Sequence, residues 1–254
     1  MYFDSHAHLD DEAFDQDREQ VIERIKSAGV ELVLNPGCTL ESSRKAAELS
    51  ARYDFIYFAA GIHPEELQDY TDENLTAMFA LARNPKCVAI GEIGLDYYWD
   101  SSHKDRQIEL FQRQLSFASD CNMPVIIHDR EAHRDCLETV KRFRGMNGVF
   151  HCFSGSAEMA QELLKLGWYI GFDGPVTYKN ARKALDVLEI CPTDRILLET
   201  DSPYLPPVPK RGKRNDPSNL QYICEKVSEL KKLSPKEISD ITRINACTLF
   251  GISV

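Results

Sequence analysis

The first residues of the chain whose types and spacing suit chemistry are His6 and His8, which follow a short apolar segment. On extended backbone this i, i+2 spacing turns both imidazoles to the same side, so that both reach one metal ion. A single pair of this kind is weak evidence, because polar residues at a strand end commonly bind nothing. The pair gains weight only if other segments bring further ligands to it.

Further acidic and histidine residues stand at the ends of later apolar segments. Glu92 ends an apolar segment, where burial of an unpaired carboxylate is costly. This residue therefore requires a partner, either a metal cation or an arginine. His128 and His151 end two successive segments, and Asp201 follows the last one. Imidazole and carboxylate ligands suit Zn²⁺, Mn²⁺, Fe²⁺ or Mg²⁺, and the residue types do not choose among these ions.

The remaining histidines divide into two kinds. His63 also follows an apolar segment, whereas His103 and His133 stand where helices are predicted to begin, which favours a surface or loop role. Cys152 adjoins His151, but neighbouring residues of a strand point to opposite sides. We therefore expect no thiolate ligand in the metal site.

Short apolar segments alternate with amphipathic helical patterns along the chain. Strands are predicted at 2–6, 31–35, 55–61, 88–92, 124–128, 149–151, 168–172 and 195–199. Helices are predicted at 15–28, 42–52, 71–83, around 108–118, and at 129–142, 157–166, 180–190, 218–231 and 235–250. The alternation predicts a parallel sheet with helical crossovers, and eight such units predict one eight-stranded parallel β/α TIM barrel with extra C-terminal helices over residues 1–254. An open doubly wound sheet stays an alternative.

A closed barrel would explain why the candidate ligands stand where they do. The carboxyl ends of barrel strands carry the chemistry, and closure places the eighth strand beside the first. Asp201 would then reach the metal held by His6 and His8. Six residues that are separately ambiguous would converge on one rim, which favours the metal site over unrelated polar residues.

The composition limits the function classes further. The formal net charge is −10, and the 43% of hydrophobic residues excludes a disordered chain. The 13 Gly and 12 Pro are scattered without a period, which excludes a collagen-like chain. No apolar run approaches the roughly 20 residues of a membrane span, and the N-terminus lacks the pattern of a signal peptide, so we expect a cytoplasmic protein. No obligate protein partner is evident.

An acidic chain repels phosphate backbones, so nucleic-acid binding would need a local basic patch such as 210–214.

An ordered set of motifs resembles the TatD family of metal-dependent deoxyribonucleases, within the amidohydrolase-like metal hydrolases. The motifs are Phe3–Leu9, Gly61–Pro64, Gly91–Tyr97, Pro124–His128, Val149–Gly155, Glu199–Leu205 and Arg214–Pro217. The resemblance covers essentially the whole chain, and it implies a distorted eight-stranded barrel that binds two divalent metal ions.

The resemblance also implies roles for single residues. It implies two metal ions that share one glutamate. The ligands of the first metal are His6, His8, Glu92 and Asp201, and those of the second are Glu92, His128 and His151. It implies substrate contacts for His63, Arg214 and Asn215. The chain departs from the family pattern at Asp129, where a small residue is common, and at Asp216, where Glu is common; neither belongs to the ligand set.

The hypothesis that follows is hydrolysis of phosphodiester bonds in single-stranded DNA, with 3′ to 5′ exonuclease action implied by the family alone. A metal-activated water would attack phosphorus, with Asp201 as the general base. Tyr97, Tyr98 and Trp99 would either stack on bases or pack as a lid. The alternative is a dinuclear hydrolase of a small amide, lactone or phosphoester, although Glu92 stands where many such relatives carry a modified lysine. A third reading is a non-catalytic module with a structural metal.

Overall fold

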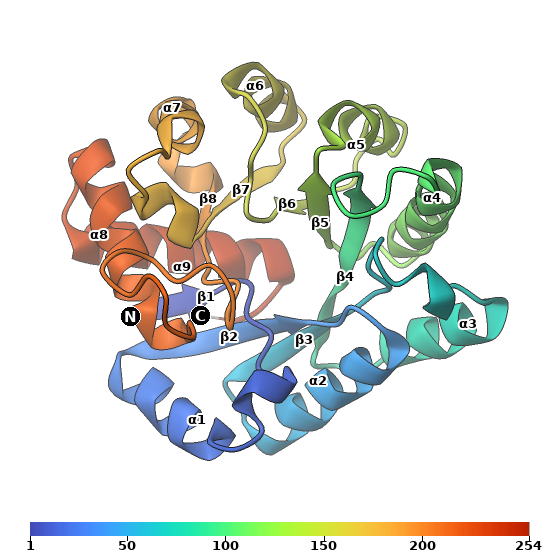
Figure 1. The fold of residues 1–254 in the computed structure, drawn as a ribbon, viewed down its shortest axis with the longest axis horizontal. Helices are drawn as coiled ribbons and strands as arrows, with labels where there is room; N and C mark the ends of the chain where they lie inside the picture. Colours follow the sequence, from blue (N-terminus) through green and yellow to red (C-terminus); the bar gives the residue numbers. More distant parts are fainter. Residues whose placement is uncertain (254) are drawn as a thin grey trace. The chain divides into compact units, whose positions relative to one another are not determined.

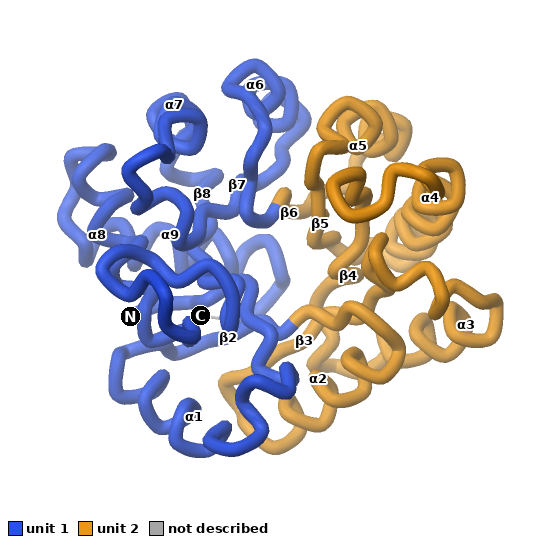
Figure 2. The backbone as a smooth tube through the Cα atoms, in the orientation of Figure 1, with its two compact units in different colours: residues 1–35, 151–254 blue, residues 36–150 orange. Residues whose placement is uncertain are grey.

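The computed structural model describes residues 1–253, and these divide into two compact units (Figure 2). Unit 1 comprises residues 1–35 and 151–253, and unit 2 comprises Pro36–Phe150. Each unit combines parallel strands with helices that follow them in the chain (Figure 1). The predicted alternation of strand and helix is confirmed in both units.

Unit 2 contains four consecutive parallel strands that pair in chain order. They are β3 (Ile56–Ala60), β4 (Cys87–Asp96), β5 (Val125–Arg130) and β6 (Gly148–Phe150). The helices of this unit are α2 (Leu40–Arg52), η2 (Leu67–Asp69), α3 (Asp72–Leu81), α4 (Lys104–Asp120) and α5 (His133–Val140).

Unit 1 joins the two ends of the chain in one set of parallel strands. These are β1 (Tyr2–Asp4), β2 (Val30–Pro36), β7 (Tyr169–Phe172) and β8 (Ile196–Leu198). β1 pairs with β2, and β7 pairs with β8. The Ser5 N–H donates to Leu198 O at 3.1 Å, and Ala7 bridges Ser202 in parallel register. The predicted placement of the last strand beside the first is therefore confirmed.

The helices of unit 1 complete the pattern and add the two expected C-terminal helices. They are η1 (Glu12–Phe14), α1 (Arg18–Ser27), α6 (Ala157–Lys165), η3 (Gly174–Thr177), α7 (Arg182–Ile190), η4 (Thr193–Arg195), η5 (Pro217–Asn219), α8 (Leu220–Lys231) and α9 (Pro235–Phe250). Ser234 and Glu237 form a capping box that begins α9, with Pro235 in its first turn. None of the helices within residues 1–253 combines the length and the apolar composition that a membrane span requires.

The ends of β4 and β5 and the start of α5 differ from the sequence expectation, and one cause explains all three. β4 continues to Asp96 and β5 to Arg130, because Leu95 pairs with Asp129 and Asp96 pairs with Arg130. The helix expected from residue 129 therefore begins at His133. Pairing with a neighbouring strand holds polar residues in extended backbone here, which their local pattern does not indicate.

Helix α4 buries two glutamines together with its apolar stripe. Gln107 and Gln114 have no exposed surface and lie among Phe111, Leu115 and other apolar residues of the stripe. A buried amide that lacks hydrogen bonds is costly, and both side chains bond to main chain at the ends of strands. These polar contacts tie the helix to the segments that carry the candidate site.

Candidate metal centre

In unit 1, the segments after β1 and β8 hold two histidines around one carboxylate. The Asp201 N–H donates to His6 O at 2.9 Å, and the His8 N–H donates to Ser202 O at 2.8 Å. The Nε2 atoms of His6 and His8 lie 3.7 and 3.5 Å from Oδ1 of Asp201, and 3.1 Å from each other. Three of the predicted ligands are therefore gathered by backbone pairing between the two ends of the chain.

His151 joins this group from the end of β6. Its ring stacks on that of His6, with 3.9 Å between centroids and 11° between planes. Its Nδ1 atom lies 3.9 Å from Oε1 of Glu199. Single ligand atoms of His6, His151 and Glu199 lie within 4.8 Å of one another, which is a spacing suited to a common metal ion.

Glu199 is a candidate ligand that was not predicted from the sequence. Its carboxylate accepts hydrogen bonds from the Ser5 hydroxyl at 3.3 Å and from the Cys152 N–H. Gly171 leaves room for it, because a Cβ at that position would lie 2.5 Å from Oε1 of Glu199. The signal available in the sequence was the i, i+2 spacing of Glu199 and Asp201, which repeats that of His6 and His8.

The two carboxylates of this group differ in their proton affinity. Burial raises the pKa of Glu199 well above its ordinary value, and the charge of Asp173 adds to this. Burial also raises the pKa of Asp201, but a hydrogen bond from His8 and the nearby His6 and His151 outweigh it and hold the pKa below its ordinary value. Asp201 is therefore ionised near neutral pH, as a metal ligand or a general base requires.

Backbone conformation supports a special role for the residues at this rim. Asp201 has a φ of 54° and Cys152 a φ of 43°, in the left-handed region that few residues other than glycine adopt. Such conformations persist where surrounding contacts fix them, and they are enriched at functional sites.

In unit 2, Glu92 is the centre of a second group. The Glu92 N–H donates to Gly37 O at 2.8 Å, which fixes the backbone of β4 at this point. Its Oε1 atom lies 2.7 Å from Nδ1 of His128 and 3.4 Å from Nε2 of His63. The two imidazoles meet edge to face, with centroids 4.2 Å apart. Unit 2 thus gathers two predicted ligands and the predicted substrate residue His63.

Asp96, at the end of β4, also contacts His128. Its Oδ2 atom lies 3.0 Å from Nε2 of this histidine. Although burial lowers the pKa of His128, the carboxylates of Asp96 and Glu92 raise it to about 10. A ligating imidazole must be neutral, so metal binding here would release a proton. Asp96 was not predicted from the sequence as a site residue.

The two other predicted substrate residues have protein partners. The Arg214 guanidinium pairs with Asp17 at 2.9 and 2.6 Å and lies over the Phe14 ring. Asn215 is buried, and its amide donates to Thr200 O and Tyr204 O, both at 2.8 Å. Asn215 therefore shapes the loop after β8. The substrate contacts of both residues stay predictions.

The donor sets of both units fit divalent metal ions. Each combines imidazole nitrogens with carboxylate oxygens, which is the chemistry of Zn²⁺, Mn²⁺ and Fe²⁺ sites. Cys152 contributes its backbone N–H to Glu199, and burial raises the pKa of its thiol, which disfavours a thiolate. The two-metal pairing implied by the resemblance, in which Glu92 is shared and His151 joins His128, stays a prediction.

Comparisons with known proteins agree with this chemistry. The profile of the family described as TatD related DNase matches residues 3–251. The metal-dependent hydrolase YabD of Bacillus subtilis is 46% identical over 255 residues, with 100% of both chains covered. A Citrobacter koseri protein named 3′-5′ ssDNA/RNA exonuclease TatD is 36% identical, with 99% of both chains covered.

A solved structure bears on the fold. The TatD homologue YJJV of Escherichia coli superposes with a TM-score of 0.94 at 33% identity, covering 99% of this chain and 98% of the other. The predicted fold class, an eight-stranded parallel β/α barrel, is thereby confirmed over the open doubly wound sheet.

Proposed function

Because the chain belongs to the family of TatD related DNases, we propose that this hydrolase cleaves phosphodiester bonds of single-stranded DNA from the 3′ end. The relative named as a 3′-5′ ssDNA/RNA exonuclease supports this choice of substrate. The observation that carries the proposal is the position of Asp201, whose Oδ1 atom lies within 3.7 Å of two imidazole nitrogens.

The predicted metal ligands are His6, His8, Glu92, His128, His151 and Asp201, and Glu199 lies close enough to His6 and His151 to share an ion with them. Two divalent ions held by these groups would acidify a water molecule and neutralise charge on the phosphate. Their identity among Mg²⁺, Mn²⁺, Zn²⁺ and Fe²⁺ is set by availability as well as by the ligands.

The side chains themselves perform the proton transfer and the positioning. Asp201, kept ionised by His8 and by the neighbouring imidazoles, accepts the proton of the attacking water as general base. His63, whose Nε2 atom lies 3.4 Å from Oε1 of Glu92, donates to a phosphate oxygen in this proposal. Donors held in place before the reaction stabilise developing charge without further reorganisation.

The loop after β8 supplies positive charge to an otherwise acidic chain. The guanidinium of Arg211 lies 4.0 Å from the Tyr178 ring centroid, and the ammonium of Lys210 lies 5.6 Å from that of Tyr222. These contacts hold the two cations on unit 1. The cations attract a phosphate backbone, and dissolved salt screens this attraction. Binding should therefore weaken as ionic strength rises.

The test is a substrate panel with matched protein variants. A 5′-labelled single-stranded oligonucleotide, its duplex, an RNA of the same sequence, a lactone and a phosphotriester are incubated with Mn²⁺ or Mg²⁺. We expect shortening of the single strand from its 3′ end and loss of that activity in Asp201→Asn. Turnover of the lactone or phosphotriester alone would favour the small-molecule hydrolase, and no turnover of any substrate would favour a non-catalytic metal module.

A further inference from the structure

Two neighbouring aromatic side chains after β4 are exposed to solvent. Trp99 is 65% exposed and Tyr98 is 57% exposed. Trp99 has the highest exposed fraction among the large hydrophobic side chains of residues 1–253. Exposed apolar surface of this kind is costly in water and marks sites of interaction when it is concentrated.

One carboxylate ties this pair to the candidate site of unit 2. The Oδ1 atom of Asp96 accepts hydrogen bonds from the Tyr98 N–H at 2.9 Å and the Trp99 N–H at 3.0 Å. The Oδ2 atom of the same carboxylate lies 3.0 Å from Nε2 of His128. The aromatic pair is therefore anchored one side chain away from a predicted metal ligand.

Arg130 adds a cation to the aromatic pair. It stands two residues after His128 on β5, and alternate residues of a strand point to the same side. Its guanidinium carbon lies 4.0 Å from the Tyr98 ring centroid and 5.4 Å from that of Trp99. The patch thus combines flat apolar faces with a donor for phosphate oxygens.

The geometry of the rings limits what they hold. Tyr98 and Trp99 meet edge to face, with centroids 4.9 Å apart and planes at 85°. Perpendicular rings do not stack together on a continuous column of bases, so one ring takes a base face while the other lies against its edge. A base in a duplex is covered on both faces, whereas an unpaired base offers a free face for stacking.

We propose that Tyr98, Trp99 and Arg130 form a docking platform for one unpaired nucleobase and its phosphate. The platform lies beside the unit 2 group of Glu92, His63 and His128. The proposal rests on the proposed function and deepens it, because it selects single strands over duplexes. Stacking tolerates any base sequence, so the platform confers preference for single strands without sequence specificity.

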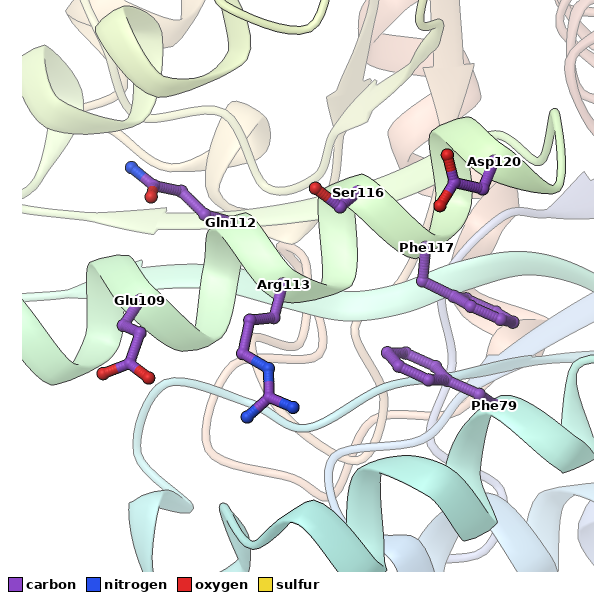
Figure 3. A pocket seen from close by; sticks show the side chains of 7 residues that line it. All are labelled: Phe79, Glu109, Gln112, Arg113, Ser116, Phe117 and Asp120. Carbon is purple, nitrogen blue, oxygen red and sulfur yellow. The ribbon is translucent and has the colours of Figure 1, made fainter.

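The first test compares two double variants that keep apolar bulk and remove aromatic faces. Tyr98→Leu/Trp99→Leu alters the platform. The control, Phe79→Leu/Phe117→Leu, alters a stacked pair with centroids 3.8 Å apart that lines a hollow on α3 and α4 (Figure 3). Each is assayed on a single-stranded oligonucleotide and on the same strand with abasic 3′-terminal nucleotides.

We expect the platform variant to raise KM on the normal strand about tenfold with kcat within about twofold, because base stacking contributes mainly to binding. The control variant should keep the KM of the unaltered protein. On the abasic strand, the platform variant and the unaltered protein should have equal KM. The proposal would be overturned if the platform variant had the same KM as the unaltered protein on the normal strand. It would also be overturned if the variant raised KM equally on the normal and the abasic strand.

The second test separates this inference from the proposed function. The chain has two tryptophans, and Trp168 is 2% exposed, so quenching by a ligand reports on Trp99. A phosphorothioate oligonucleotide titrated into the metal-loaded protein should quench the fluorescence, and its abasic counterpart should not. If the protein hydrolyses no DNA, the proposed function fails, but the quenching experiment still shows whether a nucleobase binds at Trp99. Absence of quenching by the normal strand would refute the docking platform.

Discussion

The side-chain amide of Gln107 on α4 makes hydrogen bonds to both main-chain polar groups of Asp96. The Asp96 N–H donates to Gln107 Oε1 at 2.9 Å, and Gln107 Nε2 donates to Asp96 O at 2.9 Å. Nε2 also donates to Asp100 O at 3.0 Å. Because Asp96 contacts His128 and anchors Tyr98, this buried amide fixes the part of unit 2 on which the site depends.

Replacement of Gln107 by Leu should therefore destabilise the protein. The change leaves a buried N–H and a buried carbonyl without partners, which costs about 1–3 kcal/mol for each such group. We expect the free energy of unfolding to fall by about 2–3 kcal/mol, measured by urea denaturation. Gln112→Leu on the same helix is the control, because Gln112 is partly exposed; an equal loss in both variants would contradict the role of Gln107.

Asp201→Asn should remove turnover and leave the fold intact. The amide keeps the size of the side chain but cannot accept a proton as a base, and general-base catalysis contributes about 10²–10⁴-fold. We expect kcat to fall by that order with an unchanged circular dichroism spectrum. Asp194→Asn, at the opposite end of β8, is the control and should keep full activity. Unchanged hydrolysis by Asp201→Asn would rule out this residue as the base.

Glu92→Gln and His63→Gln should separate metal binding from substrate binding. Glu92 lies 2.7 Å from His128 and is a predicted ligand, so its amide variant should lose bound metal, counted by mass spectrometry of the purified protein. His63 is predicted to contact the phosphate, so its variant should keep the metal and raise KM. Loss of metal in both variants would make His63 a ligand.

The ion pair of Asp17 and Arg214 predicts a pH-dependent contribution to stability. The hydrogen bond from Arg214 holds the pKa of Asp17 below its ordinary value. The folded state therefore binds the proton less readily than the unfolded state does. The stabilisation is present above the unfolded pKa of about 3.9 and is lost as the pH falls through the lowered pKa.

Thermal unfolding of the unaltered protein and of Asp17→Asn tests this sign. Both partners are about one-third exposed, so solvent screening keeps the effect small. We expect a slightly higher Tm for the unaltered protein at pH 6 and a smaller difference at pH 3. A difference that grows as the pH falls would contradict the assignment.

Hydrophobic periodicity was sufficient to predict the order of strands and helices. Apolar segments and amphipathic stripes depend on residues close in the chain, so the strand at 124–128 and the helix at 235–250 were recognisable from local pattern. Closure also predicted that Asp201 would lie beside His6, and the hydrogen bond from the Asp201 N–H to His6 O confirms it. These features follow from the period of each element and from the preference for neighbouring parallel strands.

Features that depend on distant partners were not predictable in the same way. The end of β5 was misplaced because Asp129 and Arg130 are held extended by β4, not by their own propensity. Glu199 and Asp96 belong to recognised motifs, but no site role was predicted for them. Their place in the site depends on contacts with residues distant in the chain, Cys152 for Glu199 and His128 for Asp96. A charge run in the sequence gives no indication of which residue each cation contacts in the fold.

Hydrolysis of DNA by this chain should require divalent ions held by its imidazoles and carboxylates. The most direct measurement is the metal content of the purified protein, taken together with hydrolysis of a single-stranded oligonucleotide before chelation, after it, and after Mn²⁺ is restored. We predict about two bound ions per chain, as two-metal hydrolases hold, with loss of activity on chelation and recovery with Mn²⁺. Hydrolysis that persists in metal-free protein, or metal-loaded protein that leaves DNA intact, would contradict the claim.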